Sequence, residues 1–230
     1  MIYFSSRRRL EKGIYLEDGN IIYCRENPEK VCHVDELKLL GMHNYENVMA
    51  AVAMAAAYHV PMEIIRKTIR EFTAVEHRIE FVAEKNGVAY YNDSKGTNPD
   101  AAIKGIQAMN RPTFLIGGGY DKDSSYDEWI QSFDGKVKKL VLLGATKEKI
   151  NETAKRLGFT DTILADTFEE AVNICVEQAE PGDAVLLSPA CASWGMFKNY
   201  EERGDKFKRT CKSIIRSGSA LKHPAKKAAV

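Results

Sequence analysis

From residue 79 onward, short apolar runs alternate with segments of helical periodicity, and this alternation limits the chain to few folds. Asn86 and Gly87 are a strong signal for a tight hairpin turn between the first two apolar runs. Strands that alternate with helices through short connections form a mostly parallel sheet covered by helices. We therefore predict an α/β, Rossmann-like domain. Its expected strands are 79–84, 88–91, 113–116, 139–143, 162–164 and 184–187, and its expected helices are 99–109, 125–133, 147–157, 168–179 and 195–213.

The first part of the chain follows a different pattern, in which a hairpin precedes two helices. Asn44 is the expected cap of the first helix. A two-stranded hairpin is only marginally stable alone, so we expect something outside this segment to bury it. The expected elements are a strand at 1–4, a hairpin of 13–16 and 20–23, and helices at 43–58 and 62–72.

A non-helical joint at residues 73–78 separates the two patterns, and we predict a domain boundary there. The last residues of the chain show no periodicity and carry basic side chains, which is typical of a flexible tail. The predicted division is an incomplete domain at 1–74, the Rossmann-like domain at 75–213 and a flexible basic tail at 214–230.

Charge and cysteine content exclude several classes of function. Residues 1–205 carry 25 basic and 32 acidic residues, which disfavours binding to nucleic acid. The five cysteines include no CxxC pair, which argues against a disulfide framework or a zinc cluster. The longest nearly apolar run, residues 48–58, is about half of the ~20 residues that a membrane-spanning helix needs. With no secretion leader recognised, we expect a soluble, cytoplasmic protein without a membrane partner.

The loop after the second expected strand is rich in reactive and polar groups. It reads Asn-Asp-Ser-Lys-Gly-Thr-Asn-Pro over residues 92–99. A helix start with Asn98 or Thr97 as cap accounts for part of this sequence. It does not account for Asp93 and Lys95, so we predict ligand contact at this loop.

Two further loops follow expected strands in the same way. Residues 117–122 read Gly-Gly-Gly-Tyr-Asp-Lys, and glycines let a backbone approach a ligand closely. Lys122 is either an anion-binding point charge or an ordinary solvated lysine. Residues 188–195 read Ser-Pro-Ala-Cys-Ala-Ser-Trp-Gly before a helix, a setting that suits an anion. Cys191 as a nucleophile is disfavoured, because no histidine is expected nearby to act as its base.

Together these segments resemble the C-terminal domain of the Mur ligases, in particular its D-glutamate-adding branch. The resemblance runs through about four-fifths of the chain, and the DNPR-type motif of the diaminopimelate- or lysine-adding branch is absent. The segments that carry it are Gly-Met-His-Asn-Tyr-Glu-Asn at 41–47, Glu-His-Arg at 76–78, residues 91–99, Gly-Gly-Tyr-Asp-Lys at 118–122 and Ser-Pro-Ala-Cys-Ala-Ser at 188–193.

The resemblance also implies what this chain lacks. Mur ligases join a UDP-sugar domain, a central ATPase domain and the C-terminal domain, and their P-loop, Mg²⁺ ligands and carbamoylated lysine precede the region resembled here. No GxxxxGK[ST] occurs in the chain. Residues 1–74 thus resemble the end of the central ATP-binding domain. ATP and Mg²⁺ are expected cofactors of the complete enzyme, with the metal ligands outside this chain.

Family chemistry, carried over by this resemblance, is ADP-forming amide synthesis through an acyl phosphate of UDP-N-acetylmuramoyl-L-alanine. Asn44 and Asn47 resemble nucleotide-binding amides, although a helix cap also explains Asn44. Arg78 resembles an arginine that reaches the ATP phosphates. Asp93 and Lys95 resemble residues that face the nucleotide and the reacting groups, so Arg78 and Lys95 are the expected catalytic residues.

The remaining residues resemble the D-glutamate-binding side of the family. Thr97 and Lys122 correspond to the residues that hold the α-carboxylate. Ser193 and the backbone at Tyr200 correspond to those that hold the side-chain carboxylate. Two separated anion sites suit a dicarboxylate and reject a monocarboxylic amino acid.

Three hypotheses follow from the sequence. The first is the C-terminal portion of a D-glutamate-adding ligase of peptidoglycan precursor synthesis, inactive as an isolated chain. The alternative is a noncatalytic binding module, or a subunit that needs a separate N-terminal partner. A stand-alone Rossmann oxidoreductase is disfavoured, because no glycine-rich dinucleotide turn follows the first strand.

Overall fold

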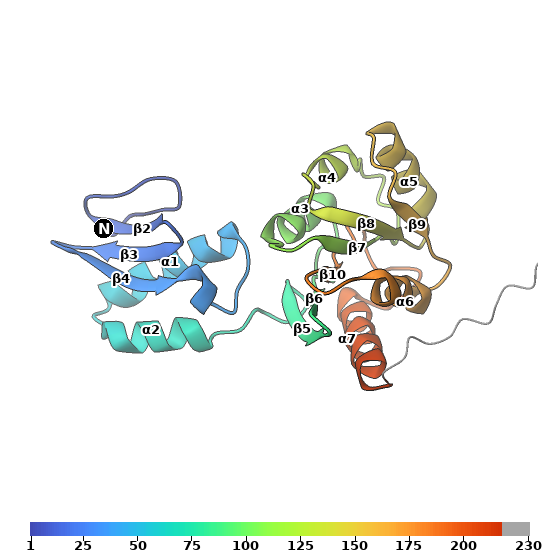
Figure 1. Ribbon diagram of the computed structural model, residues 1–230. Coiled ribbons are helices and arrows are strands. Elements are labelled where there is room, and N and C mark those ends of the chain that lie inside the picture. The colour runs from blue at the N-terminus through green and yellow to red at the C-terminus, as the bar shows by residue number, and fades with distance from the viewer. Residues whose placement is uncertain (218–230) are drawn as a thin grey trace, which may run out of the picture. The chain divides into compact units, whose positions relative to one another are not determined.

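The computed structural model describes residues 1–217, which divide into two compact units between Val75 and Glu76 (Figure 1). No helix within these residues is long and apolar enough to cross a membrane. The flexible tail was predicted to begin at residue 214, but the last helix continues to Ser217. The rest of the predicted tail, 218–230, lies outside the described residues.

The first unit is a small four-stranded sheet covered on one face by two helices. Strand order is β1-β2-β3-β4, with β1 parallel to β2 and the other pairs antiparallel. Its elements are β1 (Phe4–Ser5), β2 (Gly13–Glu17), β3 (Asn20–Cys24), β4 (Pro28–His33), the 3-10 turn η1 (Val34–Glu36), α1 (Met42–Ala57) and α2 (Met62–Glu71).

This unit has a core of its own, which corrects the expectation that the hairpin depends on an outside layer. Ile14 and Ile21 of the sheet lie in one buried cluster with Met49 and Val52 of α1 and Ile65 of α2. The covering layer is thus supplied by the two helices that follow the sheet. Burial of apolar side chains between sheet and helices stabilises the unit.

In this unit the sequence analysis missed one strand and assigned one helix cap wrongly. Strand β4 was missed, because it begins with proline and charged residues and only Val31 and Cys32 carry its apolar pattern. Asn44 does not cap α1, since the helix begins at Met42 after Gly41, whose φ of 94° suits a residue without a Cβ.

The second unit is the predicted α/β domain, with a six-stranded sheet in the order β5-β6-β10-β7-β8-β9. The β5–β6 pair is antiparallel and every other pair is parallel. Its elements are β5 (Glu80–Lys85), β6 (Val88–Asn92), α3 (Pro99–Ala108), β7 (Thr113–Gly117), α4 (Asp127–Gln131), β8 (Val137–Leu142), α5 (Lys147–Arg156), β9 (Thr162–Leu164), α6 (Phe168–Gln178), β10 (Ala184–Leu187) and α7 (Tyr200–Ser217).

Helices cover both faces of this sheet, with α6 and α7 on one side and α3 and α4 on the other (Figure 1). Phe168 of α6 and Phe207 of α7 share a buried cluster with Phe114 of β7 and Val185 of β10. The central parallel strands are buried along their whole length, as expected for strands covered on both faces.

Helix α7 begins at Tyr200, five residues later than predicted. Gly195 has a φ of 82°, which interrupts helical geometry after the predicted start. Asn199 then provides the cap, because its side-chain oxygen accepts a hydrogen bond from the Glu202 backbone N–H at 2.8 Å. The Glu202 carboxylate in turn accepts one from the Lys198 backbone N–H at 2.6 Å.

Candidate functional site

The three loops singled out in the sequence leave neighbouring strands at the same end of the sheet. Asn92 ends β6, Leu187 ends β10 and Gly117 ends β7, and β10 lies between the other two strands. All three strands are parallel, so their carboxyl ends share one edge of the sheet. Ligands of open α/β sheets bind at this edge, where the strand order departs from the chain order.

The loops after β7 and β10 are joined by backbone hydrogen bonds. The Tyr120 N–H donates to the Ala192 carbonyl oxygen at 2.9 Å, and the Gly118 N–H donates to the Pro189 carbonyl oxygen at 2.8 Å. Gly119, with a φ of 153°, passes so close to the Ala192 carbonyl that no Cβ fits. Lys122 and Ser193 follow this connection on their respective loops.

The loop after β6 is joined to the β10 loop through the Asp93 carboxylate. Asp93 Oδ2 accepts a hydrogen bond from the Ser188 hydroxyl at 2.7 Å, and Asp93 Oδ1 accepts one from the Ile79 N–H at 3.3 Å. Burial raises the pKa of Asp93 to about 7, against the opposing effects of these bonds and of the Arg78 and Arg203 charges. Both carboxylate oxygens are thus used inside the domain, and nucleotide contact by Asp93 stays a prediction.

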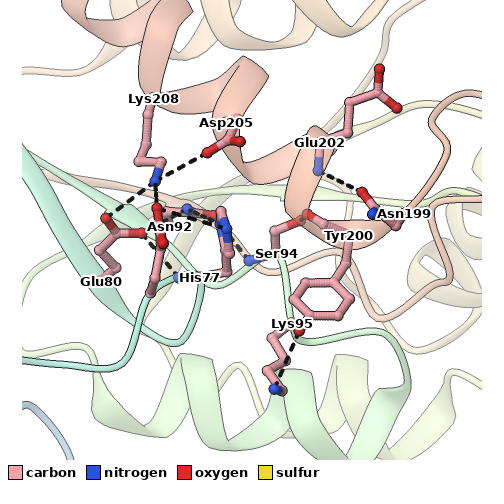
Figure 2. A network of polar contacts seen from close by, with 11 residues as sticks. His77, Glu80, Asn92, Ser94, Lys95, Asn199, Tyr200, Glu202, Asp205 and Lys208 are labelled. Atoms are coloured by element: carbon pink, nitrogen blue, oxygen red, sulfur yellow. Dashed lines mark hydrogen bonds and ion pairs between the residues drawn. The ribbon is translucent and has the colours of Figure 1, made fainter.

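Lys95 and Thr97 lie further along the β6 loop and are half-buried. The Lys95 ammonium lies 3.4 Å from the Tyr200 hydroxyl and 5.2 Å from the centre of that ring (Figure 2). Asn98 caps α3, because its side-chain oxygen accepts a hydrogen bond from the Ala101 N–H at 2.9 Å. The capping explanation therefore applies to Asn98, and it leaves the predicted ligand role of Thr97 open.

Arg78 is exposed between two buried residues whose backbones are in the left-handed region. His77 has a φ of 64° and Ile79 a φ of 47°. The His77 ring nitrogen Nδ1 lies 3.0 Å from the Asn92 amide nitrogen (Figure 2). The backbone carbonyl oxygen of His77 accepts a hydrogen bond from the Lys95 backbone N–H at 3.0 Å. The backbone on both sides of Arg78 is thus fixed to the end of β6 while its side chain faces solvent.

Lys122 is exposed and rests on an aromatic side chain of the neighbouring loop. Its ammonium lies 5.2 Å from the centre of the Trp194 ring, which also packs edge-on against Tyr120 at 5.4 Å between centroids. Among the described side chains, those of residues 1–214, it has no ion-pair partner. Since Trp194 follows Ser193 directly, this contact places Lys122 beside the Ser193 loop.

Tyr200 opens helix α7 next to the β6 loop. Its carbonyl oxygen accepts a hydrogen bond from the Ser94 hydroxyl at 2.7 Å (Figure 2). The first N–H groups of a helix have no partner within the helix and carry a partial positive charge. The backbone at Tyr200 is therefore suited to an anion.

Ser193 and Cys191 are both buried in the β10 loop. The Cys191 sulfur lies 3.1 Å from the Tyr126 hydroxyl and 3.4 Å from that of Thr146. Burial raises the pKa of the Cys191 thiol. A buried thiol in its neutral form is a packing residue, as the sequence favours.

Asn44 and Asn47 belong to the first unit. The Asn44 amide donates a hydrogen bond to the Leu40 carbonyl oxygen at 2.7 Å, and Asn47 is exposed on α1. Their predicted contact with nucleotide stays a prediction.

Arg203 was missed by the sequence reasoning, although it is among the largest fully buried side chains within residues 1–217. A signal for it exists in the spacing of α7. Arg203 precedes Phe207, Cys211 and Ile214 at helical intervals, and these three residues form the buried face of the helix. An arginine in that register faces the core.

One cluster of metal-ligating groups occurs in the described part of the chain. One ligand atom each of Glu76, His77 and Asp205 lie within 4.8 Å of one another. The Lys208 ammonium forms an ion pair with Glu76. It forms another with Asp205 at 3.2 Å (Figure 2). This ammonium already supplies a positive charge to the carboxylates, so we propose no metal there.

Comparison with known proteins decides the family. Residues 77–191 match the family described as "Mur ligase, glutamate ligase domain". The chain belongs to the Mur ligase family. The matched residues include the β6 and β7 loops of this Mur ligase chain and the first part of its β10 loop, up to Cys191.

Curated relatives of this Mur ligase chain carry the name UDP-N-acetylmuramoylalanine–D-glutamate ligase. The relative from Lachnoclostridium phytofermentans is 59% identical over 209 residues, which are 90% of this chain and 46% of the relative. That from Lachnospira eligens is 55% identical over 210 residues, with 90% and 46% covered. The chain spans about half the length of the curated relatives it matches, and the match lies in their C-terminal half.

Solved structures share the fold at low sequence identity. UDP-N-acetylmuramate-alanine ligase from Thermotoga maritima aligns with a TM-score of 0.65 at 15% identity, over 91% of this chain and 47% of that one. MurF ligase from Thermotoga maritima, solved with ADP, aligns with a TM-score of 0.54 at 14% identity, over 90% and 47%. The predicted α/β fold with a mostly parallel sheet is confirmed.

Proposed function

We propose that this chain is the C-terminal portion of the cytoplasmic ligase that adds D-glutamate to UDP-N-acetylmuramoyl-L-alanine. The observation that carries the proposal is the backbone connection between the loops of Lys122 and Ser193, at the strand ends where such folds bind ligands. Relatives at 46–59% identity bear this enzyme's name, which supports the same reaction. The overall chemistry is ADP-forming amide synthesis from an acyl phosphate.

Two anion sites explain selection of D-glutamate. Lys122 and Thr97 bind the α-carboxylate, and Ser193 with the Tyr200 backbone N–H binds the side-chain carboxylate. An ammonium, two hydroxyls and a helix N-terminus are suitable partners for carboxylates. A monocarboxylic amino acid leaves one of these sites without its partner, which costs affinity.

On the nucleotide side, Arg78 and Lys95 are the catalytic residues, since their cations stabilise the charge that develops during phosphoryl transfer. Asn44 and Asn47 are the proposed nucleotide-binding residues of the first unit, and Arg78 and Asp93 are those of the second unit. An exposed guanidinium and a half-buried ammonium fit phosphate groups. ATP and Mg²⁺ supply the activating phosphoryl transfer, and the metal ligands belong to the missing half of the ligase.

We further propose that residues 1–74 are the end of the central ATP-binding domain and that 75–213 form the C-terminal domain. With no P-loop in the chain, ATP lacks its phosphate cradle and metal site. The purified chain with ATP, Mg²⁺, UDP-N-acetylmuramoyl-L-alanine and D-glutamate should release no phosphate above a blank. Turnover above the blank would contradict the assignment of phosphate binding to the missing half.

Binding of D-glutamate tests the amino-acid site directly. The exposed Trp194 lies in the site while Trp129 is fully buried, so ligand-induced changes in fluorescence report on Trp194. Association entropy offsets most of the hydrogen-bond gain, so the expected Kd is on the order of millimolar, near −4 kcal/mol. In Lys122→Ala, the fluorescence change should no longer saturate with D-glutamate, because this variant lacks the only ammonium assigned to a carboxylate.

The matched control is Lys104→Ala, which removes an exposed lysine of α3. It should bind D-glutamate as the unmodified chain does. Equal loss in both variants, or equal binding by both, would contradict the role of Lys122.

A subunit that needs a separate N-terminal partner is the alternative, favoured by the outer face of α1. Ala51, Met54 and Tyr58 line this face at helical spacing, and Met54 is 63% and Tyr58 85% exposed. Mixing the chain with the N-terminal half of the Lachnoclostridium phytofermentans relative distinguishes the two hypotheses. Phosphate release that requires both polypeptides supports the subunit, and its absence favours a covalently continuous ligase.

A further inference from the structure

Arg203 connects three segments that each carry a proposed D-glutamate-binding residue. Its Nε donates to the Ser94 hydroxyl at 3.0 Å, and its Nη2 donates to the Ser94 carbonyl oxygen at 2.8 Å. Its Nη1 donates to the Cys191 carbonyl oxygen at 3.0 Å. The Ser94 hydroxyl donates onward to the Tyr200 carbonyl oxygen at 2.7 Å. One guanidinium thus holds the β6 loop, the β10 loop and the start of α7.

This guanidinium is buried without a carboxylate bound to it. Arg203 is 1% exposed and forms no ion pair with any side chain of residues 1–214. Its partners are two carbonyl oxygens and one hydroxyl, all neutral. The Asp93 carboxylate interacts with it electrostatically but forms no ion pair with it. Burial of a guanidinium is costly, so apolar packing alone does not explain an arginine here. The planar set of N–H donors of the guanidinium explains the arginine, since the ammonium of a lysine has no equivalent geometry.

The two loops held by Arg203 carry opposite ends of the proposed amino-acid site. Lys95 and Thr97 follow Ser94, whereas Ser193 follows Cys191 by two residues. The distance between the two loops sets the spacing of the two anion sites. The guanidinium of Arg203 is hydrogen-bonded to both loops.

We propose that Arg203 is a positioning residue that fixes the spacing of the two carboxylate sites and thereby favours a dicarboxylate. This inference rests on the proposed function. Arg203 does not touch the amino acid itself. It acts through its hydrogen bonds to the hydroxyl and carbonyl of Ser94 and to the carbonyl of Cys191.

The test compares Arg203→Lys with Arg209→Lys, a control at an exposed arginine of the same helix. Lysine keeps the charge and lets the domain fold, but it cannot serve both loops with a planar fork. Kd values for D-glutamate and D-glutamine are measured by Trp194 fluorescence, because D-glutamine keeps one carboxylate only. Arg203→Lys should reduce the preference for D-glutamate about tenfold. Arg209→Lys should leave it unchanged.

Hydrogen exchange of the loop amides provides a readout that needs no ligand. In Arg203→Lys, amides of residues 94–97 and 191–193 should exchange faster, while those of the central strands keep their protection. A second variant, Ser94→Ala, removes one acceptor of the guanidinium and should accelerate exchange in the same loops.

The outcomes separate the inference from the proposed function. If the unmodified chain binds D-glutamate and Arg203→Lys keeps the preference, Arg203 has no positioning role while the proposed function stands. If the unmodified chain does not bind D-glutamate, the proposed function fails. Hydrogen exchange of the loop amides then tests by itself whether Arg203 holds the two loops together. Faster exchange that occurs only in Arg203→Lys and Ser94→Ala supports this role of Arg203, and unchanged exchange overturns it.

Discussion

The loop after β6 and the loop after β7 both looked like ligand-binding segments in the sequence, yet they use their polar side chains differently. In the β6 loop, both polar side chains point inward. The Asp93 carboxylate accepts hydrogen bonds from Ser188 and Ile79. The Ser94 hydroxyl accepts one from Arg203 and donates one to the Tyr200 carbonyl oxygen. In the β7 loop, the glycines form a close-packed base and the charged tip, Lys122, rests on Trp194 in solvent.

The difference shows that a polar loop can be rigid for two reasons. The β6 loop is held by buried hydrogen bonds of its side chains, which are costly to leave unsatisfied. The β7 loop is held by backbone contacts that only glycine permits, and its polar side chain stays available. Density of polar residues alone therefore does not identify the residues that touch a ligand.

The largest effect is expected at the base of the β7 loop. Gly118 has a φ of 99°, and a Cβ there would clash with the Leu143 carbonyl oxygen. Gly118→Ala should lower the free energy of unfolding by about 3 kcal/mol or more, from left-handed strain plus overpacking. Gly135→Ala is the control, because Gly135 has a φ of 71° and open space around its Cβ position. It should cost about 1–2 kcal/mol.

Urea unfolding of both variants measures this difference. Equal destabilisation would mean that the base of the β7 loop yields to a Cβ. It would then be no more rigid than an open surface turn.

The next effect concerns the buried carboxylate of the β6 loop and depends on pH. The pKa of Asp93 is raised to about 7, above the value of about 3.9 of an unfolded chain. The protonated Asp93 carboxyl therefore contributes fully to the free energy of unfolding below pH 4. This contribution is lost as the pH rises through about 7. Asp93→Asn keeps an acceptor for Ile79 and a donor for Ser188, without the charge.

Asp93→Asn should match the unmodified chain at pH 4 and be more stable by about 1–3 kcal/mol at pH 8. Thermal unfolding across this range measures the change, with Asp134→Asn, an exposed position, as the control. A stability difference independent of pH would show that Asp93 stays ionised in the fold.

The smallest effect is expected at Tyr200, which contacts the β6 loop. Its hydroxyl lies 3.4 Å from the Lys95 ammonium, a weak contact, whereas its carbonyl oxygen accepts the 2.7 Å bond from Ser94. Tyr200→Phe should change stability by less than about 0.5 kcal/mol and leave D-glutamate binding unaltered. Ser94→Ala should cost about 1–2 kcal/mol, because it also removes a partner of Arg203. If Tyr200→Phe were more destabilising than Ser94→Ala, the Tyr200 hydroxyl would be the group that supports the β6 loop.

Much of the second unit follows from the sequence, because apolar runs of strand length alternate with amphipathic segments there. Helix α7 was placed too early, since nothing local signals that Gly195 adopts a left-handed conformation. Strand β4 was missed because pairing with β3 overrides a weak local pattern.

The candidate site was predictable as a set of loops but not as a set of contacts. Strand ends and glycines identify the three loops by position alone. Asp93 and Arg203 were not separable from surface charges, since their burial depends on packing between segments about a hundred residues apart. Only the register of Arg203 with Phe207 and Cys211 gives a local signal.

The position of β10 has a consequence for the order of assembly during synthesis. This strand is the last to emerge, yet it pairs with β6 on one side and β7 on the other. Until it inserts, the β5–β6 hairpin and the β7–β8–β9 sheet have no common neighbour. Because contacts over such long sequence separation form slowly, we expect the strand ends that carry the three loops to come together late in folding.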